Sequence, residues 1–321
     1  MSLNHRILIG AVLAASLVLA ACGDDDPLRP SEFAPPTNVT METGEFSIKL
    51  DWQASPFAGA SEFAGYNVYA DTASIAGMSD TTDAEFLAER KINADPITAR
   101  QYTVAMEADT TPLVRGQRYY LHVRSVRNDG RVSVASNEVH TAPRPQGDND
   151  IGNDDLLMYD FSATTSTPSA YGWERFSGLG QPYATSEANQ EEIDFFMIEE
   201  PNSTDDGSEF VSPSQTTITA GWSQRNRSLF QDLGAGEAAW AVAVAPDTAD
   251  MTTRVKVVND HTYALYLHDG HWAKIRVTMF EKNIQVPSSG GPSVVLNRVT
   301  FTYAFQLLED YPRFKPGGGI E

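Results

Sequence analysis

The sequence predicts an all-β protein of two domains, an N-terminal β-sandwich followed by a second, larger antiparallel β domain. The chain has 321 residues, enough for two domains of ordinary size. Short runs of alternating apolar and polar residues recur between Gly, Pro, Asn and Asp turn signals, as in antiparallel strands. Because only one cysteine is present, packed cores rather than internal disulfides must stabilise both domains.

Residues 1–21 are predicted to be a secretion signal. Arg6 precedes an apolar run from Ile7 to Leu19, which is shorter than the ~20 apolar residues of a transmembrane helix. The run ends at Leu19-Ala20-Ala21-Cys22. This box resembles the signal of bacterial lipoproteins, and the resemblance implies that Cys22 carries lipid. An ordinary secretory signal that ends near a cysteine is the alternative.

Residues 22–36 read as an acidic, proline-containing tether. The alternative to a plain spacer is an address, because the acidic run 24–26 resembles the surface-export signal of some bacterial lipoproteins. Gly23 also differs from the aspartate that retains many lipoproteins at the inner membrane. We therefore expect an outer-membrane lipoprotein of the cell envelope, on either face. The formal net charge of −20 argues against nucleic acid as a partner and leaves the lipid anchor as the contact with the membrane.

Residues 37–143 are predicted to form the β-sandwich. In the run from Phe46 to Trp52, apolar side chains fall on one face of a strand. The segment Glu85–Arg90 is expected to form a short helix or strand. The expected strands are Asn38–Glu42, Phe46–Gln53, Phe63–Ala70, Arg100–Ala105, Arg118–Arg127 and Val132–His140.

This segment resembles a fibronectin type III domain. Leu50-Asp51-Trp52 and Gly65-Tyr66-Asn67-Val68-Tyr69 match strands B and C of that family. Leu113 to Tyr119 matches its tyrosine corner, with Arg115 where the family has proline. The resemblance implies structural roles for three residues. Trp52 and Tyr66 are expected in the sandwich, and the Tyr119 hydroxyl is expected to return to backbone near Leu113.

Residues 144–155 are predicted to be an acidic linker. Asp148, Asp150 and Asp154 have the alternate spacing of oxygen ligands in calcium loops. The segment departs from the EF-hand pattern, because its Gly is not at the sixth place and no Glu stands at the twelfth. Calcium binding and a plain flexible linker both remain open.

Residues 156–310 are predicted to form the second β domain, and 311–321 a flexible tail. A short helix is expected at Arg225–Leu233. The expected strands are Leu156–Phe161, Ile193–Glu199, Thr216–Ala220, Ala239–Ala245, Arg254–Val258, Tyr263–His268, His271–Phe280 and Val294–Leu307.

Asp269-Gly270 between two alternating runs predicts a hairpin with a two-residue turn. Such a turn sets His268 opposite His271 and Leu267 opposite Trp272. Two adjacent imidazoles on one face suggest a metal or haem ligand pair. The alternative is two exposed histidines beside a turn, since no third ligand is evident nearby.

The hairpin from Asp269 to Ile275 and the run from Val299 to Gln306 resemble the C-terminal part of haem-binding lipoproteins of the HmuY type. The resemblance implies a related fold and haem as a ligand. It does not place the ligands residue by residue, and the family's aspartate-tryptophan-aspartate segment is not evident. The nearest match to that segment is 192–196.

The sequence predicts a lipid-anchored cell-envelope protein with a non-enzymatic binding or structural role. Signatures of serine hydrolases, HExxH zinc proteases, P-loop proteins and dinucleotide-binding proteins are absent from it. No cofactor is certain, with haem or calcium as the alternatives, and the partner at the cell surface is a protein or a glycan. Haem or metal capture is the second hypothesis. Carbohydrate binding is the third, through Tyr171, Trp173 and Trp222, which are otherwise core residues.

Overall fold

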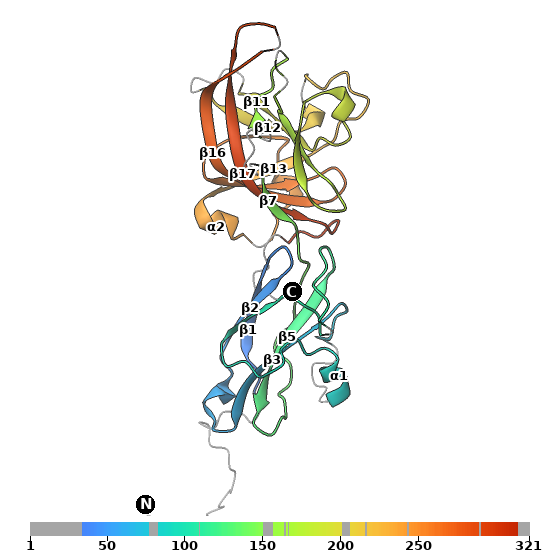
Figure 1. The fold of residues 1–321 in the computed structure, drawn as a ribbon, viewed down its shortest axis with the longest axis vertical. Helices are drawn as coiled ribbons and strands as arrows, with labels where there is room; N and C mark the ends of the chain where they lie inside the picture. The colour runs from blue at the N-terminus through green and yellow to red at the C-terminus, as the bar shows by residue number, and fades with distance from the viewer. Residues whose placement is uncertain are drawn as a thin grey trace, which may run out of the picture.

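The computed structural model describes residues 34–76, 83–108, 110–149, 157–163, 165, 167–200, 206–215, 217–242, 244–288 and 290–313. The predicted signal, the lipid site Cys22 and most of the predicted tether lie outside these ranges. Two of the three calcium candidates, Asp150 and Asp154, also lie outside them. The described chain is nearly all antiparallel β-structure, which confirms the predicted fold class. Figure 1 shows two β bodies arranged end to end. Among the described residues, no helix is long and apolar enough to cross a membrane.

The first domain is built from two three-stranded sheets. One sheet contains β1 (Thr37–Thr43), β2 (Ile48–Gln53) and β4 (Gln101–Val104). The other contains β3 (Phe63–Asp71), β5 (Tyr119–Arg127) and β6 (Val139–Thr141). Burial alternates along β2, because one face of the strand covers the core and the other meets water. Trp52 meets Tyr66 edge-on across this core, with 5.5 Å between ring centroids.

Two short helical segments complete the first domain. They are the 3-10 helix η1 (Pro56–Gly59) and the helix α1 (Ala84–Ala88). The Asp83 carboxylate accepts a hydrogen bond from the Phe86 N–H and so caps α1. The sequence had left helix and strand open at this position, and the cap favours the helix. The expected strand Val132–His140 is reduced to β6, while Ser133 and Ser136 still donate singly to β5.

The second domain contains two larger sheets. One has the order β10 (Gly180–Tyr183), β9 (Ala170–Trp173), β11 (Phe195–Glu199), β12 (Ser208–Val211) and β14 (Arg254–Lys256). The other has the order β13 (Leu229–Ala235), β15 (His261–Tyr266), β16 (Trp272–Val286), β17 (Val294–Gln306) and β7 (Gln146–Asp148), and β8 (Met158–Tyr159) also pairs with β17. The helical segments are α2 (Gly236–Trp240), η4 (Glu187–Asn189), η5 (Pro213–Gln215) and η6 (Thr248–Asp250).

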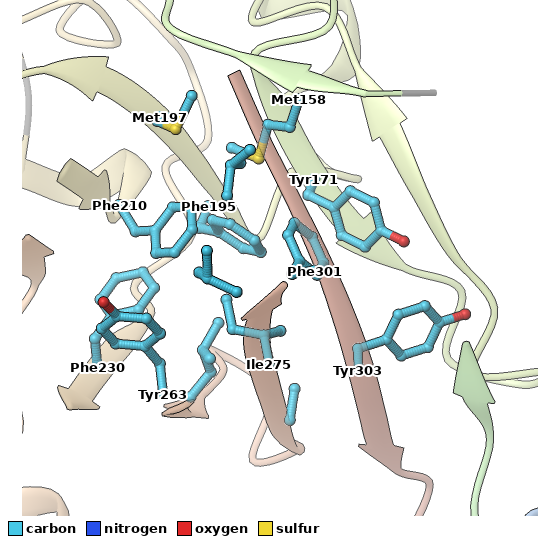
Figure 2. Close-up of a cluster of buried hydrophobic side chains, with 14 of the residues drawn as sticks. Met158, Tyr171, Phe195, Met197, Phe210, Phe230, Tyr263, Ile275, Phe301 and Tyr303 are labelled. Carbon is cyan, nitrogen blue, oxygen red and sulfur yellow. The ribbon is translucent and has the colours of Figure 1, made fainter. Parts of the chain in front are cut away.

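An aromatic core lies between these two sheets (Figure 2). Phe195 and Phe210 meet edge-on at 5.2 Å, and Tyr171 meets Phe301 at 4.9 Å. All four side chains are fully buried. Edge-to-face contacts of this kind add to the free energy of burial. The core therefore holds together β9, β11 and β12 of one sheet and β17 of the other.

Several sequence expectations for the second domain are wrong. Arg225–Leu233 is not a helix, because Leu229 onward pairs with β15 as strand β13. The start of the expected strand Ala239–Ala245 lies in α2. The expected strand Thr216–Ala220 is not formed, because its described residues 217–220 lie in a bend and a turn. Strands β9, β10 and β12 were not predicted, since they are four-residue segments with little alternation.

The domain boundary also differs from the sequence expectation. The segment 146–148 is strand β7, which pairs with β17, so the second domain begins before residue 156. Asp148 lies in this strand, opposite Thr302. At the other end, Tyr311 is buried and its hydroxyl contacts His140. The start of the expected flexible tail is therefore packed against the first domain.

Candidate functional site at the domain junction

The predicted histidine hairpin is present, but its register is shifted by one residue. Tyr266 pairs with Trp272, and Tyr263 pairs with Ile275. The Gly270 N–H donates to the Leu267 carbonyl at 3.1 Å, and Gly270 has a φ of +87°. The loop thus has three residues, with glycine in the left-handed position, rather than a two-residue turn. Because a one-residue shift exchanges the faces of a strand, the predicted pairing is wrong.

The shift places His268 and His271 in different surroundings. His271 is buried and stacks on Phe305, with 5.5 Å between centroids and 15° between planes. Its Nδ1 lies 3.1 Å from an Asp269 oxygen. His268 is exposed at the loop, and its Nδ1 lies 3.9 Å from Asp194 Oδ1. The predicted face-to-face ligand pair is therefore not formed. In the described part of the chain, no three His, Cys, Asp or Glu side chains are grouped to hold a metal ion.

Arg175 joins this hairpin loop to the neighbouring sheet. Its guanidinium donates to both oxygens of Asp194, at 2.9 and 2.6 Å, and also to the Asp269 carboxylate. Asp194 is 0% exposed and accepts a further hydrogen bond from the Trp173 N–H at 3.0 Å. Burial opposes ionisation of Asp269, but the His271 and Arg175 contacts outweigh it and hold the pKa of that carboxyl well below its usual range. Paired and hydrogen-bonded in this way, the buried charges fix the two loops relative to each other.

The loop 174–179, which connects β9 to β10, begins next to this cluster. The Glu174 carboxylate accepts hydrogen bonds from the Phe176 and Ser177 N–H groups. The Gly178 N–H donates to the Glu174 carbonyl at 2.7 Å. Gly178 has a φ of +67°, and a Cβ there would lie 2.3 Å from Pro145. This position therefore requires glycine. The loop is internally bonded, yet it leaves Phe176 92% exposed.

Four exposed apolar side chains lie on three loop segments that Arg115 connects, at residues 46, 114 and 176–179; we call them the junction patch. Its members are Phe46, Val114, Phe176 and Leu179, with exposures of 49, 54, 92 and 55%. The Arg115 guanidinium lies 4.3 Å above the Phe46 ring, pairs with Glu45 and donates to the Ser177 carbonyl at 3.4 Å. The patch thus contains residues of both domains, which Arg115 of the first domain links through the Ser177 carbonyl of the second.

Sequence reasoning missed the residues that shape this surface. Asp194 lies in the segment 192–196, which the sequence relates only to the haem-protein motif, and Arg175 and Phe176 belong to no motif. Local sequence does not show that Arg175 reaches a carboxylate nineteen residues away. The usable signal was Glu174 followed by Ser177-Gly178, which is typical of a tight, hydrogen-bonded loop.

The aromatic residues proposed for carbohydrate contact are not exposed together. Tyr171 and Trp173 are 0 and 3% exposed and belong to the core. Trp222 is half-buried beside a separate cluster around Phe196. A sugar-stacking platform made of these three side chains is therefore excluded, because two of them face the interior.

The residues assigned structural roles in the first domain are all buried. Trp52, Tyr66 and Tyr119 are 5, 1 and 2% exposed. The Tyr119 hydroxyl accepts a hydrogen bond from the Val114 N–H at 3.0 Å and donates to Glu107 at 2.6 Å. Burial, followed by the Glu107 contact, raises the pKa of Tyr119 to about 12. The hydroxyl therefore remains a neutral donor and acceptor at the base of the loop that carries Val114.

No family model matches the sequence, and no curated protein matches it. Among solved structures, the chain is similar to a DUF4466 family protein from Parabacteroides merdae, with 10% identity over 85% of this chain and 94% of that chain and a TM-score of 0.32. It is also similar to an α-L-rhamnosidase from Dictyoglumus thermophilum, with 6% identity over 86 and 25% of the two chains and a TM-score of 0.28. A myokine structure matches 35% of this chain and 98% of its own at 22% identity and a TM-score of 0.23. Similarity at this level carries no argument about function.

Proposed function

We propose that this protein is a lipid-anchored, non-enzymatic binding or structural protein of the cell envelope, attached through Cys22. The junction patch is its binding surface. The single observation that carries the binding role is the 92% exposure of Phe176 on a loop that its own hydrogen bonds hold in place. Aromatic residues on rigid supports are typical centres of protein interfaces, because little side-chain entropy is lost when they are covered.

The proposed architecture is a fibronectin type III-like first domain that carries a second β domain. The paired three-stranded sheets and the contact of Tyr119 with Val114 support this assignment. Haem or metal capture by His268 and His271 receives less support, because His271 would have to leave its stack on Phe305. A protein partner at the cell surface fits the exposed patch better than a small ligand does.

Site-specific photo-cross-linking in intact cells tests the binding role. A photoreactive phenylalanine analogue replaces Phe176, and in a matched control it replaces Met279, which is 42% exposed on β16. We expect a discrete adduct from position 176 that is absent from position 279 and is lost when Leu179→Ser is added. No adduct at position 176, or equal adducts at both positions, would contradict the proposal.

A further inference from the structure

Three arginines lie where the first domain meets residues 311–313 at the end of the described chain. None of them belongs to the junction patch. They are Arg118 of the first domain, Arg144 of the connecting segment and Arg313. The Arg118 guanidinium lies 4.6 Å above the Tyr311 ring. Arg144 Nη1 donates to the Arg313 carbonyl at 3.2 Å. Burial raises the pKa of the Tyr311 hydroxyl, and the charges of Arg313, Arg118 and Arg144 each oppose that rise, so all three arginines lie near this side chain.

This cluster is unusual in a chain with a formal net charge of −20. None of the three arginines forms an ion pair with a carboxylate of the described residues. The contrast is with Arg115, Arg175 and Arg298, which all pair with acids. Within the described part of the chain, no carboxylate pairs with these arginines, although the sequence has almost twice as many acidic as basic residues.

Arg144 is the most deeply buried member of the cluster, so its charge is the least solvated. It is 4% exposed, and its Nε has no hydrogen-bond partner. Burial lowers the pKa of Arg144 to about 9, and only Tyr311 acts in the opposite direction. An uncompensated buried charge destabilises a fold unless a counter-charge is supplied. Arg118 and Arg313 are only half-buried, so an ion from solvent can reach the edge of the cluster.

The neighbouring polar groups do not supply that counter-charge. The Tyr311 hydroxyl is bonded to His140, at 2.9 Å from Nδ1 and 3.2 Å from the carbonyl oxygen. Burial, followed by the charges of Arg313 and Arg118, lowers the pKa of His140, which Glu138 opposes. The Glu138 carboxylate itself accepts hydrogen bonds from Ser74 and Ile75. The Glu138 carboxylate is thus engaged in another part of the first domain.

We propose that the cluster of Arg118, Arg144 and Arg313 is a binding site for an oxyanion, either a carboxylate or a phosphate group. Guanidinium groups suit this ligand, because their planar set of N–H donors matches two oxygens at once. A bound oxyanion would compensate the buried charge of Arg144 and link the connecting segment to residue 313. The inference goes beyond the proposed function, because it does not depend on the junction patch or on a protein partner.

Equilibrium dialysis of the full-length protein in detergent tests the site. Radiolabelled inorganic phosphate and radiolabelled succinate are used separately, at fixed ionic strength with chloride as the balancing anion. We expect saturable binding of at least one probe, which identifies the class of oxyanion. Binding of phosphate alone indicates a phosphoryl ligand, binding of succinate alone a carboxylate, and binding of both a general oxyanion site.

Substitutions of a half-buried residue test the location without threatening the fold. Arg118→Gln is expected to weaken binding about tenfold, the loss of one charge-assisted contact. Arg118→Lys, which keeps the charge, should retain part of the affinity. Arg227→Gln, a change at an exposed arginine elsewhere, is the matched control and should bind as the wild type does. Absence of binding for both probes at millimolar concentration, or unchanged binding by Arg118→Gln, would overturn the proposal.

Discussion

His122 shows how one buried side chain makes the first domain sensitive to pH. It is 2% exposed, and its Nε2 accepts a hydrogen bond from Arg124 Nε at 3.1 Å. Burial, followed by the charge of Arg124, lowers the pKa of His122 to about 3. In the unfolded chain the pKa of histidine is about 6.5. The unfolded state therefore binds the proton first as the pH falls, and the free energy of unfolding must decrease with it.

We predict that the free energy of unfolding falls between about pH 6.5 and pH 3 with a contribution from His122 of at most ~1.4 kcal/mol per pH unit. His122→Gln keeps an acceptor for Arg124 and removes the titration. Urea unfolding of both proteins at several pH values measures their free energies of unfolding. The value for the wild type minus that for the variant should decrease as the pH falls. Parallel pH profiles for the two proteins would show that His122 is not responsible.

Trp52 occupies the centre of the sandwich core, and its replacement should show how much that core depends on it. We predict that Trp52→Ala lowers the free energy of unfolding of the first domain by ~3–5 kcal/mol, because it removes a large buried side chain and leaves a cavity. Trp222→Ala, at a half-buried position in the other domain, serves as the control. A shared unfolding midpoint of the Trp52 variant and the wild type would reject a central role for this side chain.

At the scale of single residues, buried positions could be predicted where a run alternates, and paired partners could not. Leu50 and Trp52 lie two apart in the sequence, so one face of their strand is evident. Asp194 and Arg175 are nineteen residues apart, and only the tertiary fold brings them together. For the same reason the sequence identified His268, Asp269 and His271 but not Arg175, which joins Asp269 to Asp194.

At the scale of elements, the Arg175 guanidinium holds Asp269 of the hairpin loop close to the buried Asp194, and we call this contact the clamp. We predict that Arg175→Met lowers the free energy of unfolding by ~3–5 kcal/mol, because it leaves the buried Asp194 carboxylate without its counter-charge. Adding Asp194→Asn should recover part of this loss. Chemical unfolding of both variants measures the two effects.

A matched substitution separates the clamp from ordinary surface pairs. Arg254 is 47% exposed on the side-chain scale and pairs with Glu209. Arg254→Met should therefore change the free energy of unfolding by only ~0–1 kcal/mol. A similar small effect of Arg175→Met would mean that solvent, rather than Arg175, satisfies Asp194.

The hairpin at His268 shows where prediction of elements stops. Asp-Gly between alternating runs correctly predicted two paired strands, but loop length was misjudged by one residue. Asp-Gly suits both a two-residue turn and a three-residue loop that ends in a left-handed glycine, so the residue types do not distinguish the two loop lengths. The helix expected at Arg225–Leu233 failed for a related reason. Leu229 and Phe230 are adjacent in strand β13, and their side chains pack into two different hydrophobic clusters. This tertiary packing overrides the local helical pattern.

At the scale of the whole molecule, the proposed anchor determines where the protein works. We predict that Cys22→Ser releases the protein into the soluble fraction, because a serine cannot receive the lipid chains that hold it. Fractionation of cells and immunoblotting measure the distribution. Ala54→Ser, an exposed change in the first domain, controls for handling of the variant. Sedimentation of the Cys22 variant with membranes would contradict lipid attachment.

The all-β class of the whole chain followed from its alternation and turns, whereas the junction did not. Residues 144–155 are acidic and rich in glycine and asparagine, so they were expected to be a linker. Strand β7 forms there because β17 offers an edge to pair with, as Tyr303 opposite Gly147 shows. A pairing of segments more than 150 residues apart leaves no local trace in composition.

The chain enters the second domain next to the place where it leaves. Arg144 Nη1 contacts the carbonyl of Arg313, so both ends of the intervening 168-residue stretch meet at one point. A unit whose ends meet can be inserted into a surface loop of another protein without turning the host chain. We also expect it to accept new chain ends in one of its exposed loops. We therefore expect that the second domain can be moved to another protein in one piece, through two chain junctions that lie side by side.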